Sequence, residues 1–495
     1  MRKRLRAVPP RVWLISIILL ATAVRLFRLG HQSLWFDEAR SFTRASMSLP
    51  ETLRQTLTVL HPPLYSFTLH FWLKVGHSET LLRFPSAAFG VLAVPLIYQL
   101  GRLCMSRRTG LMAALLLALD PFHVWYAQEA RMYSLLMLLA LSAAYFFLRT
   151  IRDNSRWSWG GLVASCALAY YTHYFAFFIP LVQFTFFLCT LRTYHRLFRK
   201  WVLGQIIAAL PLTPWVIAYA FAFRSGQAVG FGLVPKPGLL APVETLWKFS
   251  LGSTDTLTPV LALFLAAFGL TFLLGVKSSS RMRCPHFRLF TLLWLGVPIL
   301  FTYLLALRRS FYIDRCFIIV LPAYLILLAM GIVGIGKSLV RRGLTSVIIL
   351  AMTFGLSQLY FAPLFFKEDW RAAASYIQSQ YRDGDVIVSR YVQDGMPLFY
   401  YYQGDPDWTA LSVEKITMPL EFVAQDHQRL WLVYYRPRLY AAGHSVSRLD
   451  AFSLEEEPAP FIREWLAANQ DNLLTERNFP GVYIALYRIL PRSEP

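Results

Sequence analysis

Long apolar runs separated by short polar segments make up the first 362 residues of the chain. A helix that crosses a bilayer needs about 20 mostly apolar residues, and most of these runs approach that length. The pattern predicts about eleven membrane-spanning helices. We expect them near residues 12–29, 83–103, 109–120, 132–149, 157–171, 174–191, 201–222, 258–276, 288–307, 316–336 and 344–362.

After residue 362 the apolar runs become short and their spacing changes. Apolar residues from Trp370 to Ile377 recur at helical intervals, and Asp383-Gly384-Asp385 is typical of a turn into a buried strand. We expect helices over 368–381 and 461–468, and strands over 386–388, 430–435 and 482–487. The predicted fold class is therefore mostly α, a polytopic membrane domain at 1–362 with a small C-terminal α/β soluble domain at 363–495.

Charged residues predict an orientation for this membrane domain. If the N-terminus lies inside, the inner segments hold 22 basic residues and one acid, Asp153, while the tail from residue 363 has a net charge of −5. Basic residues stay on the cytoplasmic side of membrane proteins, so we expect the N-terminus inside and the C-terminal domain outside. The net charge of +21 thus reflects topology, and nucleic-acid binding is excluded.

The composition agrees with this interpretation, since 56% of the residues are hydrophobic and only 16% are charged. None of the five cysteines lies after Cys316, so the C-terminal domain has no disulfide framework. We therefore expect a multi-pass protein of a bacterial inner (plasma) membrane, with its C-terminal domain periplasmic or extracellular.

The first outer loop, residues 30–82, combines aromatic and acidic residues. Trp35 and Phe36 suit the headgroup region, and Asp37 and Glu38 follow at the expected start of a helix. A second helix is expected to begin at Ser48-Leu49-Pro50-Glu51, so that two interfacial helices lie on the membrane with an acid pair at headgroup depth. The simpler alternative is that Asp37 only caps its helix.

Two prolines, Pro62 and Pro63, come later in this loop and stiffen the entry to the next segment. They would present His61 and Tyr65 in a fixed direction, towards a substrate. The alternative is an ordinary helix start with an exposed histidine.

Charged and aromatic residues recur in the other outer loops. The second loop runs from Asp120 to Tyr133, and Arg131 in it is suited to binding a phosphate with two hydrogen bonds. Arg315 is expected in an outer loop, where basic residues are less common than on the cytoplasmic side. Its position there needs another reason, and we expect it to bind an anionic lipid phosphate. The residues assigned to substrate binding are His61, Tyr65, Glu129, Arg131, Tyr133, His173, Tyr312 and Arg315. An interfacial aromatic belt, with Arg315 paired to a loop acid, is the alternative.

Several common chemistries lack their motifs in this sequence. The chain has no His-Glu-x-x-His helix, no glycine-rich phosphate loop with Lys and Ser/Thr, and no dinucleotide fingerprint. We therefore do not expect the phosphate donor to be a cytoplasmic nucleotide.

Three motifs in the outer loops resemble a known family. Trp35-Phe36-Asp37-Glu38-Ala39-Arg40, His61-Pro62-Pro63-Leu64-Tyr65 and Gln128-Glu129-Ala130-Arg131-Met132-Tyr133 are similar to bacterial glycosyltransferase family 39. This group resembles the protein O-mannosyltransferases and the aminoarabinose transferases that modify lipid A, and its fold is called GT-C. The resemblance covers roughly residues 10–340.

The resemblance implies a membrane enzyme that moves a sugar from a polyprenyl-phosphate donor to a lipid, glycan or protein acceptor on the outer face. Asp37 falls on the family's first-loop catalytic carboxylate, with Glu38 as its partner, and Asp120 falls on the second-loop acid. His61 stands where the aminoarabinose transferases have a lysine. We expect inversion at the sugar, with Asp37 as base. No cofactor is certain, and a divalent cation at Asp37 and Asp120 is left open.

Two other classes of function remain as alternatives at this stage. A polyprenyl-diphosphate-glycan ligase or polymerase would have a similar architecture but would consume a diphosphate-linked donor. A lipid or sugar transporter would also have many spans. Transporters, however, tend to show internal repeats and charges at mid-membrane, whereas the acids here lie in outer loops and no repeat is visible.

Overall fold

The computed structural model describes residues 9–58, 62–225, 236–252, 258–278, 282–308, 311–389, 397–403, 427–435, 465 and 467–489. The chain forms two compact units. The first comprises Met1–Leu29 and Met47–Phe361, and the second comprises Gly30–Ser46 and Ala362–Pro495. His61, one of the expected site residues, lies outside the described residues.

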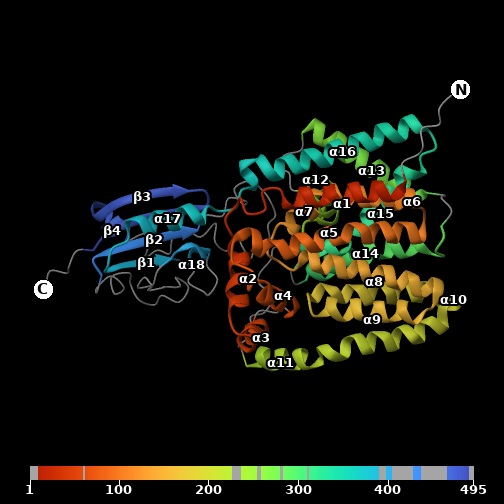
Figure 1. Ribbon diagram of the computed structural model, residues 1–495, viewed down its shortest axis with the longest axis horizontal. Coiled ribbons are helices and arrows are strands. Elements are labelled where there is room, and N and C mark those ends of the chain that lie inside the picture. The colour runs from red at the N-terminus through yellow and green to blue at the C-terminus, as the bar shows by residue number, and fades with distance from the viewer. Residues whose placement is uncertain are drawn as a thin grey trace. The chain divides into compact units, whose positions relative to one another are not determined.

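The first unit is helical, as Figure 1 shows. Its 3-10 turns are η1 (Tyr174–Phe177), η2 (Leu210–Leu212) and η3 (Asp314–Ile319). Its α-helices are α1 (Pro10–Leu26), α3 (Leu49–Thr58), α4 (Leu64–Trp72), α5 (Glu79–Cys104), α6 (Arg107–Leu119), α7 (Pro121–Ala127), α8 (Tyr133–Asp153), α9 (Arg156–Tyr170), α10 (Phe178–Ala209), α11 (Thr213–Arg224), α12 (Ala241–Leu251), α13 (Pro259–Lys277), α14 (Phe287–Ala306), α15 (Leu321–Gly334) and α16 (Ser338–Phe361).

Every predicted span overlaps one of these helices, so the mostly helical, multi-pass fold is confirmed. Among the described residues, six helices are long and apolar enough to cross a membrane, or seven if the bent pair α6 and α7 forms one span. The apolar helix α15 is shorter, with 14 residues. The count of eleven spans therefore stays a prediction.

The chain reverses within the continuous helical stretch around α10. The backbone leaves helical geometry at Thr190 and Tyr194. Trp201 Nε1 donates to Gln183 Oε1 at 2.7 Å, although the two residues are 18 positions apart. Such a separation would be about 27 Å along a straight helix, so the segments on either side of the break must pack antiparallel. This hairpin corresponds to the two spans expected at 174–191 and 201–222.

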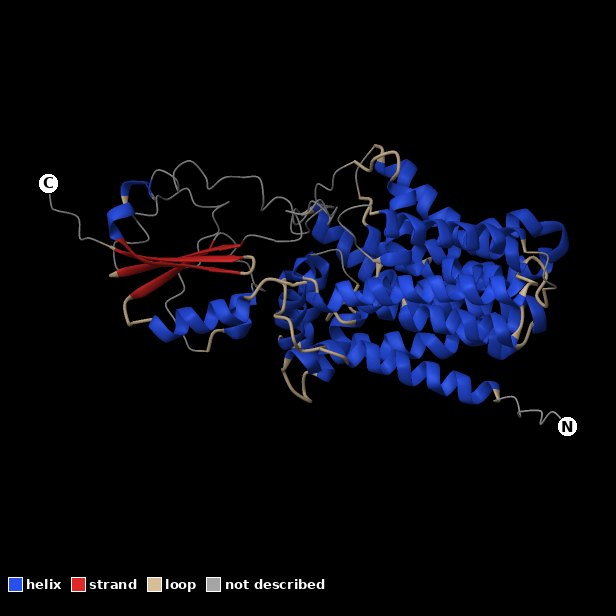
Figure 2. Cartoon of the chain, turned by 90° about the horizontal axis from the view of Figure 1, so that it is seen from above, coloured by secondary structure: helices blue, strands red, loops and turns tan. Residues whose placement is uncertain are grey.

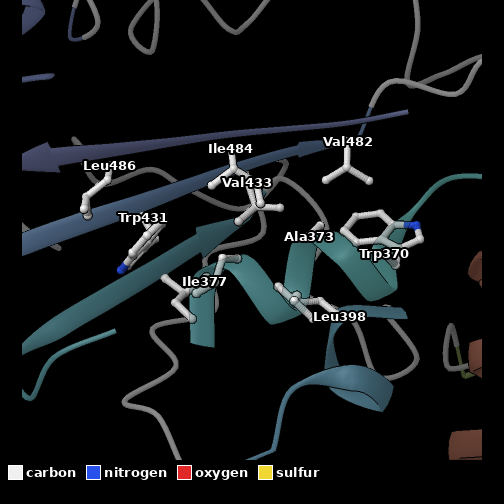
Figure 3. Close-up of a cluster of buried hydrophobic side chains, with 11 residues drawn as sticks. Trp370, Ala373, Ile377, Leu398, Trp431, Val433, Val482, Ile484 and Leu486 are labelled. Carbon is white, nitrogen blue, oxygen red and sulfur yellow. The ribbon is translucent and has the colours of Figure 1, made fainter. Parts of the chain in front are cut away.

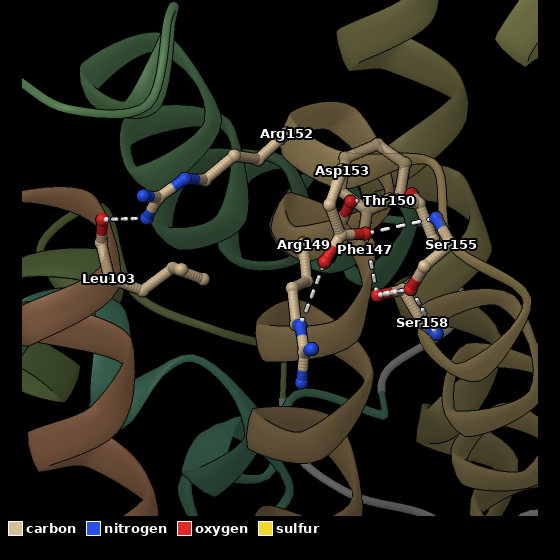
Figure 4. Close-up of polar contacts among 8 residues, drawn as sticks. All are labelled: Leu103, Phe147, Arg149, Thr150, Arg152, Asp153, Ser155 and Ser158. Carbon is tan, nitrogen blue, oxygen red and sulfur yellow. Dashed lines mark hydrogen bonds and ion pairs between the residues drawn. The ribbon is translucent and has the colours of Figure 1, made fainter.

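The turn between α8 and α9 explains why one acid accompanies the basic residues expected inside. Asp153 ends α8, and its carboxylate accepts from Ser155 N at 3.0 Å and Ser158 Oγ at 2.8 Å. Arg149, one turn earlier, pairs with the same carboxylate at 3.0 Å (Figure 4). Asp153 therefore fixes the start of α9 while its charge is balanced locally.

The second unit contains one four-stranded sheet with the order β1-β2-β4-β3. Strands β1 and β2 are parallel, and the other two pairs are antiparallel. Its elements are α2 (Phe36–Ser46), η4 (Pro363–Phe365), α17 (Trp370–Gln380), β1 (Asp385–Ser389), α18 (Pro397–Tyr401), β2 (Arg429–Tyr435), η6 (Gln470–Asn472), β3 (Leu473–Phe479) and β4 (Val482–Arg488).

The predicted helix over 368–381 and the three predicted strands are confirmed as α17, β1, β2 and β4. Strand β3 was missed because its sequence, Leu-Leu-Thr-Glu-Arg-Asn-Phe, lacks a buried alternating pattern and forms a sheet edge. Most of the helix expected over 461–468 lies outside the described residues.

Helix α17 lies along one face of this sheet (Figure 2). Its apolar residues Trp370, Ala373 and Ile377 point towards Trp431 and Ile484 of the sheet (Figure 3). These side chains are at most 2% exposed. The opposite face of the sheet is also covered, since Val386, Leu430 and Ala485 are buried there. The unit thus has its own hydrophobic core, as expected for a separate soluble domain.

Helix α2 is the main departure from the expected division of the chain. The whole first loop was expected in the membrane domain at 1–362, but Gly30–Ser46 forms a compact unit with the C-terminal part. The contacts responsible connect residues more than 300 positions apart, so no local pattern reveals them. The loop's second helix, α3, belongs to the first unit, where Thr52 and Thr56 are buried and Leu53 is exposed.

Candidate functional site

Two arginines converge on one tyrosine in the first unit. The Cζ atoms of Arg131 and Arg315 lie 5.9 Å and 5.8 Å from the centre of the Tyr133 ring. Arg131 precedes α8, Tyr133 begins it, and Arg315 lies in η3. Arg131 and Tyr133 are only 5% and 2% exposed. Arg315 is half-buried. Two guanidinium groups at one aromatic ring are suited to binding an anion.

His173 belongs to the same cluster. Its ring centre lies 6.2 Å from that of Tyr133 and 4.2 Å from that of Tyr174, on which it stacks. Burial and, to a smaller extent, the positive charges of Arg131 and Arg315 lower the pKa of His173 to about 3. Phe175 N donates to His173 Nδ1 at 3.1 Å. The neutral ring therefore carries its proton on Nε2, which makes this atom a hydrogen-bond donor.

Replacing His173 by Gln should make the stability of the protein less sensitive to acid. The pKa of His173 falls from 6.5 to about 3 on folding, so between these values the unfolded chain binds a proton that the folded chain does not. The free energy of unfolding of the wild type should then decrease as the pH drops below this upper value, by at most about 1.4 kcal/mol per pH unit. Melting temperatures in detergent between about pH 7 and pH 4 test this. Equal slopes for both proteins would contradict it.

Helix α12, which sequence analysis did not predict, supports the segment that carries Arg315. Lys248 of this helix forms an ion pair with Asp314. Thr245 donates to Asp314 Oδ1 at 2.8 Å and lies within hydrogen-bond distance of the Tyr312 hydroxyl. Burial raises the pKa of Tyr312, so its hydroxyl stays protonated. Asp314 is thus held by α12 rather than by its neighbour Arg315.

Tyr65 supports the backbone of the second loop. Ser86 Oγ donates to the carbonyl oxygen of Arg131 at 2.9 Å, and the Tyr65 hydroxyl lies 2.9 Å from Ser86 Oγ. Because the serine proton goes to Arg131, Tyr65 is the donor in the second bond. The Pro-Pro-Leu-Tyr segment is also anchored by Leu64 N, which donates to Tyr171 O at 2.9 Å. Through Ser86, Tyr65 therefore connects the first outer loop to the backbone carbonyl of Arg131.

The other acids of the second loop, Asp120 and Glu129, are buried, at 0% and 3% exposure. Asp120 caps α7, because its Oδ1 accepts from His123 N at 2.7 Å. Arg25 donates to His123 Nδ1 at 2.7 Å and to the carbonyl oxygens of α6 that precede this cap. Within the described residues, Asp120 Oδ2 has no hydrogen-bond partner. The expected role of Asp120 in catalysis stays a prediction.

The acid pair of the first loop lies in the second unit, and its two members differ. Asp37 is half-buried in the first turn of α2. Glu38 is fully buried and pairs with Lys367 Nζ at 3.0 Å. Successive residues of a helix point about 100° apart, so both acids cannot face one ligand in the same way. Lys367 was not among the predicted site residues, because it lies 329 positions after Glu38 and no local motif connects the two.

No group of three or more His, Cys, Asp or Glu side chains that could hold a metal ion is found within the described part of the chain. The divalent cation left open at Asp37 and Asp120 therefore stays a prediction.

Comparisons with known proteins place this arrangement in a class. The family model described as dolichyl-phosphate-mannose-protein mannosyltransferase matches residues 60–218. No curated protein sequence matches the chain. Two crystal structures of ArnT from Cupriavidus metallidurans are similar, one in the apo state and one bound to undecaprenyl phosphate. Each shares 13% sequence identity with this chain and gives a TM-score of 0.64. Each match covers 96% of this chain and 98% of ArnT.

The apo crystal structure of the Archaeoglobus fulgidus oligosaccharyltransferase is also similar, with 14% identity and a TM-score of 0.50 over 86% of this chain and 70% of that one. At such identities the structural matches show the fold. Together with the family model they define a membrane glycosyltransferase with the GT-C fold. Within that class, the chain resembles the dolichyl-phosphate-mannose-protein mannosyltransferase family over residues 60–218, and it shares the fold of ArnT.

Proposed function

We propose that this protein transfers a sugar from a polyprenyl-phosphate donor to an acceptor hydroxyl on the outer face of the membrane, inverting the anomeric centre. The observation that carries the proposal is the cluster of Arg131, Arg315 and His173 around Tyr133. The fold agrees with it, since one of the similar ArnT structures holds undecaprenyl phosphate.

The cluster suits the phosphate group of a polyprenyl-phosphate sugar in three ways. Guanidinium groups bind phosphate oxygens with two parallel hydrogen bonds, which fixes the orientation of the phosphate as well as its charge. His173 adds a neutral donor, so it does not compete with the arginines for charge. The surrounding aromatic rings exclude water, and the low local dielectric strengthens each contact.

Asp37 is proposed as the general base. It removes the proton from the acceptor hydroxyl while the hydroxyl oxygen attacks the anomeric carbon from the side opposite the phosphate. The bond from the anomeric carbon to the phosphate oxygen breaks, and its electron pair leaves with polyprenyl phosphate. Negative charge grows on the leaving phosphate, so Arg131 and Arg315 stabilise the transition state more than the ground state.

The burial of the two first-loop acids supports this choice of base. Glu38 is already neutralised by Lys367 and is closed to solvent. Asp37 is the member of the pair with part of its surface accessible. A general base must reach within about 2.6–3.2 Å of the proton it accepts, which a fully buried, ion-paired carboxylate does not do.

The donor class can be tested by the product that leaves. Purified protein should release undecaprenyl phosphate from at least one sugar in a panel of undecaprenyl-phosphate monosaccharides, including mannose and aminoarabinose, when a crude outer-envelope fraction supplies acceptors. The matched panel of undecaprenyl-diphosphate sugars should give no release of undecaprenyl diphosphate. Release from diphosphate donors only would instead assign the protein as a glycan ligase or polymerase.

We propose the N-in, C-out orientation for this reaction, in a bacterial inner membrane, because the basic residues gather in segments on one side of the predicted spans. The acceptor then approaches from the periplasmic or extracellular side.

A further inference from the structure

We propose that Lys367 is a positioning residue for Asp37: by pairing with Glu38 it fixes the first turn of α2 and so the direction of the Asp37 carboxylate. This inference rests on the proposed function, in which Asp37 is the general base. It assigns the C-terminal part of the chain a role in the catalytic step.

The residues that lead into α2 are fixed by the segment that leads into α17. Lys367 N donates to Gln32 Oε1 at 2.9 Å, and Arg371 N donates to Ser33 Oγ at 3.2 Å. The Arg371 guanidinium donates to Gly30 O at 3.2 Å. Three residues of the short segment 30–33 thus bind residues 367–371, which leaves little freedom for the start of the helix.

Residues of α18 hold the same helix from another direction. Leu34 N donates to the Tyr401 hydroxyl at 2.8 Å. Further along α2, the rings of Phe42 and Tyr400 meet edge to face with their centres 4.8 Å apart. These contacts set where α2 lies, whereas the rotation of its first turn depends on the charged pair.

The ion pair of Glu38 and Lys367 is buried on both sides. The side chains are 0% and 8% exposed, and Nζ lies 3.0 Å from Oε2. The same Oε2 accepts from Trp35 N at 3.4 Å, one turn back, and the Lys367 ammonium lies 5.9 Å from the centre of the Trp35 ring. Glu38 is therefore held at both the helix start and the C-terminal segment.

Asp37 depends on this arrangement because it is the preceding residue of the same turn. When Glu38 points inwards, helix geometry directs Asp37 about 100° away from it. If Lys367 loses its charge, the buried Glu38 carboxylate loses its ion pair with the C-terminal segment, and the first turn of α2 is no longer held against that segment. A misplacement of about 1 Å at a reacting group can lower a rate about 100-fold.

The test compares Lys367→Met with a matched variant of the same unit, Arg429→Met. Arg429 also forms a buried ion pair, 2.6 Å from Asp385 Oδ2, but it lies in the sheet on β2. Both variants remove one partner of a buried pair and should lose similar stability. Lys367→Arg keeps the charge and serves as the rescue.

Two readouts on full-length protein separate positioning from general stability. Amide hydrogen exchange of the peptide covering α2 should speed up in Lys367→Met and remain at the wild-type rate in Arg429→Met. Release of undecaprenyl phosphate, from the donor that turns over in the panel, should show kcat lowered about 100-fold in Lys367→Met with donor KM unchanged. Lys367→Arg should recover most of kcat, and Arg429→Met should keep the wild-type kcat per folded molecule.

Unchanged α2 exchange in Lys367→Met, or a kcat that falls equally in Arg429→Met, would overturn the inference. An Asp37→Asn variant is assayed in parallel. If it keeps wild-type activity, the proposed base fails. If it is inactive while Lys367→Met has normal kcat, only the positioning role fails. If no donor turns over, the proposed donor class fails. The exchange measurement then decides the positioning role alone: faster exchange of α2 in Lys367→Met only supports it, and unchanged exchange refutes it.

Discussion

Asp37→Asn should lower the rate of sugar transfer by about 100- to 10,000-fold, the range that general base catalysis contributes. The amide is nearly isosteric with the carboxylate but does not accept the acceptor's proton, so folding and donor binding should be unchanged. The measurement is release of undecaprenyl phosphate under single-turnover conditions, with donor affinity determined separately.

Asp383→Asn is the matched control for this experiment. It makes the same chemical change in the same unit, at an exposed turn residue before β1. It should keep full activity. An Asp37→Asn protein with wild-type transfer would rule out Asp37 as the base.

Replacing both Arg131 and Arg315 by Gln should produce the second large effect. Each hydrogen bond from a charged group contributes about 1.5–3 kcal/mol, so each arginine that contacts the donor phosphate should be worth roughly 10- to 150-fold in kcat/KM. The donor KM should rise, and kcat should fall as well, because charge increases on the phosphate as the bond breaks. Steady-state kinetics with varied donor concentration measure both constants.

Arg149→Gln provides the control for the arginine variants. Arg149 pairs with Asp153 at the end of α8 and is exposed, so its loss removes a positive charge without touching the Tyr133 cluster. The double variant must lose far more activity than this control. Replacing Arg315 by Lys should restore only part of the loss, because an ammonium does not form the two parallel bonds of a guanidinium. Normal donor kinetics in the double variant would exclude the cluster as the phosphate site.

The local elements of this protein follow closely from its sequence. The helix over 370–380 and the strands at 385–389, 429–435 and 482–488 lie within a few residues of their predicted positions. Their apolar patterns are strong because α17 packs one face against the sheet, while β1, β2 and β4 have buried residues on both faces. Strand β3 and helix α12 were missed, since β3 is an exposed edge and α12 is short.

The candidate site was only partly predictable. Arg131, Tyr133, His173 and Arg315 were each singled out by residue type and by their place in outer loops. Their convergence on one ring comes from three different chain segments, which the sequence does not connect. Tyr65 hydrogen-bonds to Ser86, which in turn holds the backbone of Arg131, and its predicted contact with substrate stays a prediction.

The sequence by itself determined the membrane character, the helical periodicity and the residues with suitable chemistry, because hydrophobic spacing and charge bias act over a few turns of the chain. Only the tertiary structure decided that α2 belongs with the C-terminal unit and that Glu38 is paired with Lys367, 329 positions later. Such pairings depend on how distant segments pack, and the free energy that selects them comes from burial and charge compensation that no local pattern records.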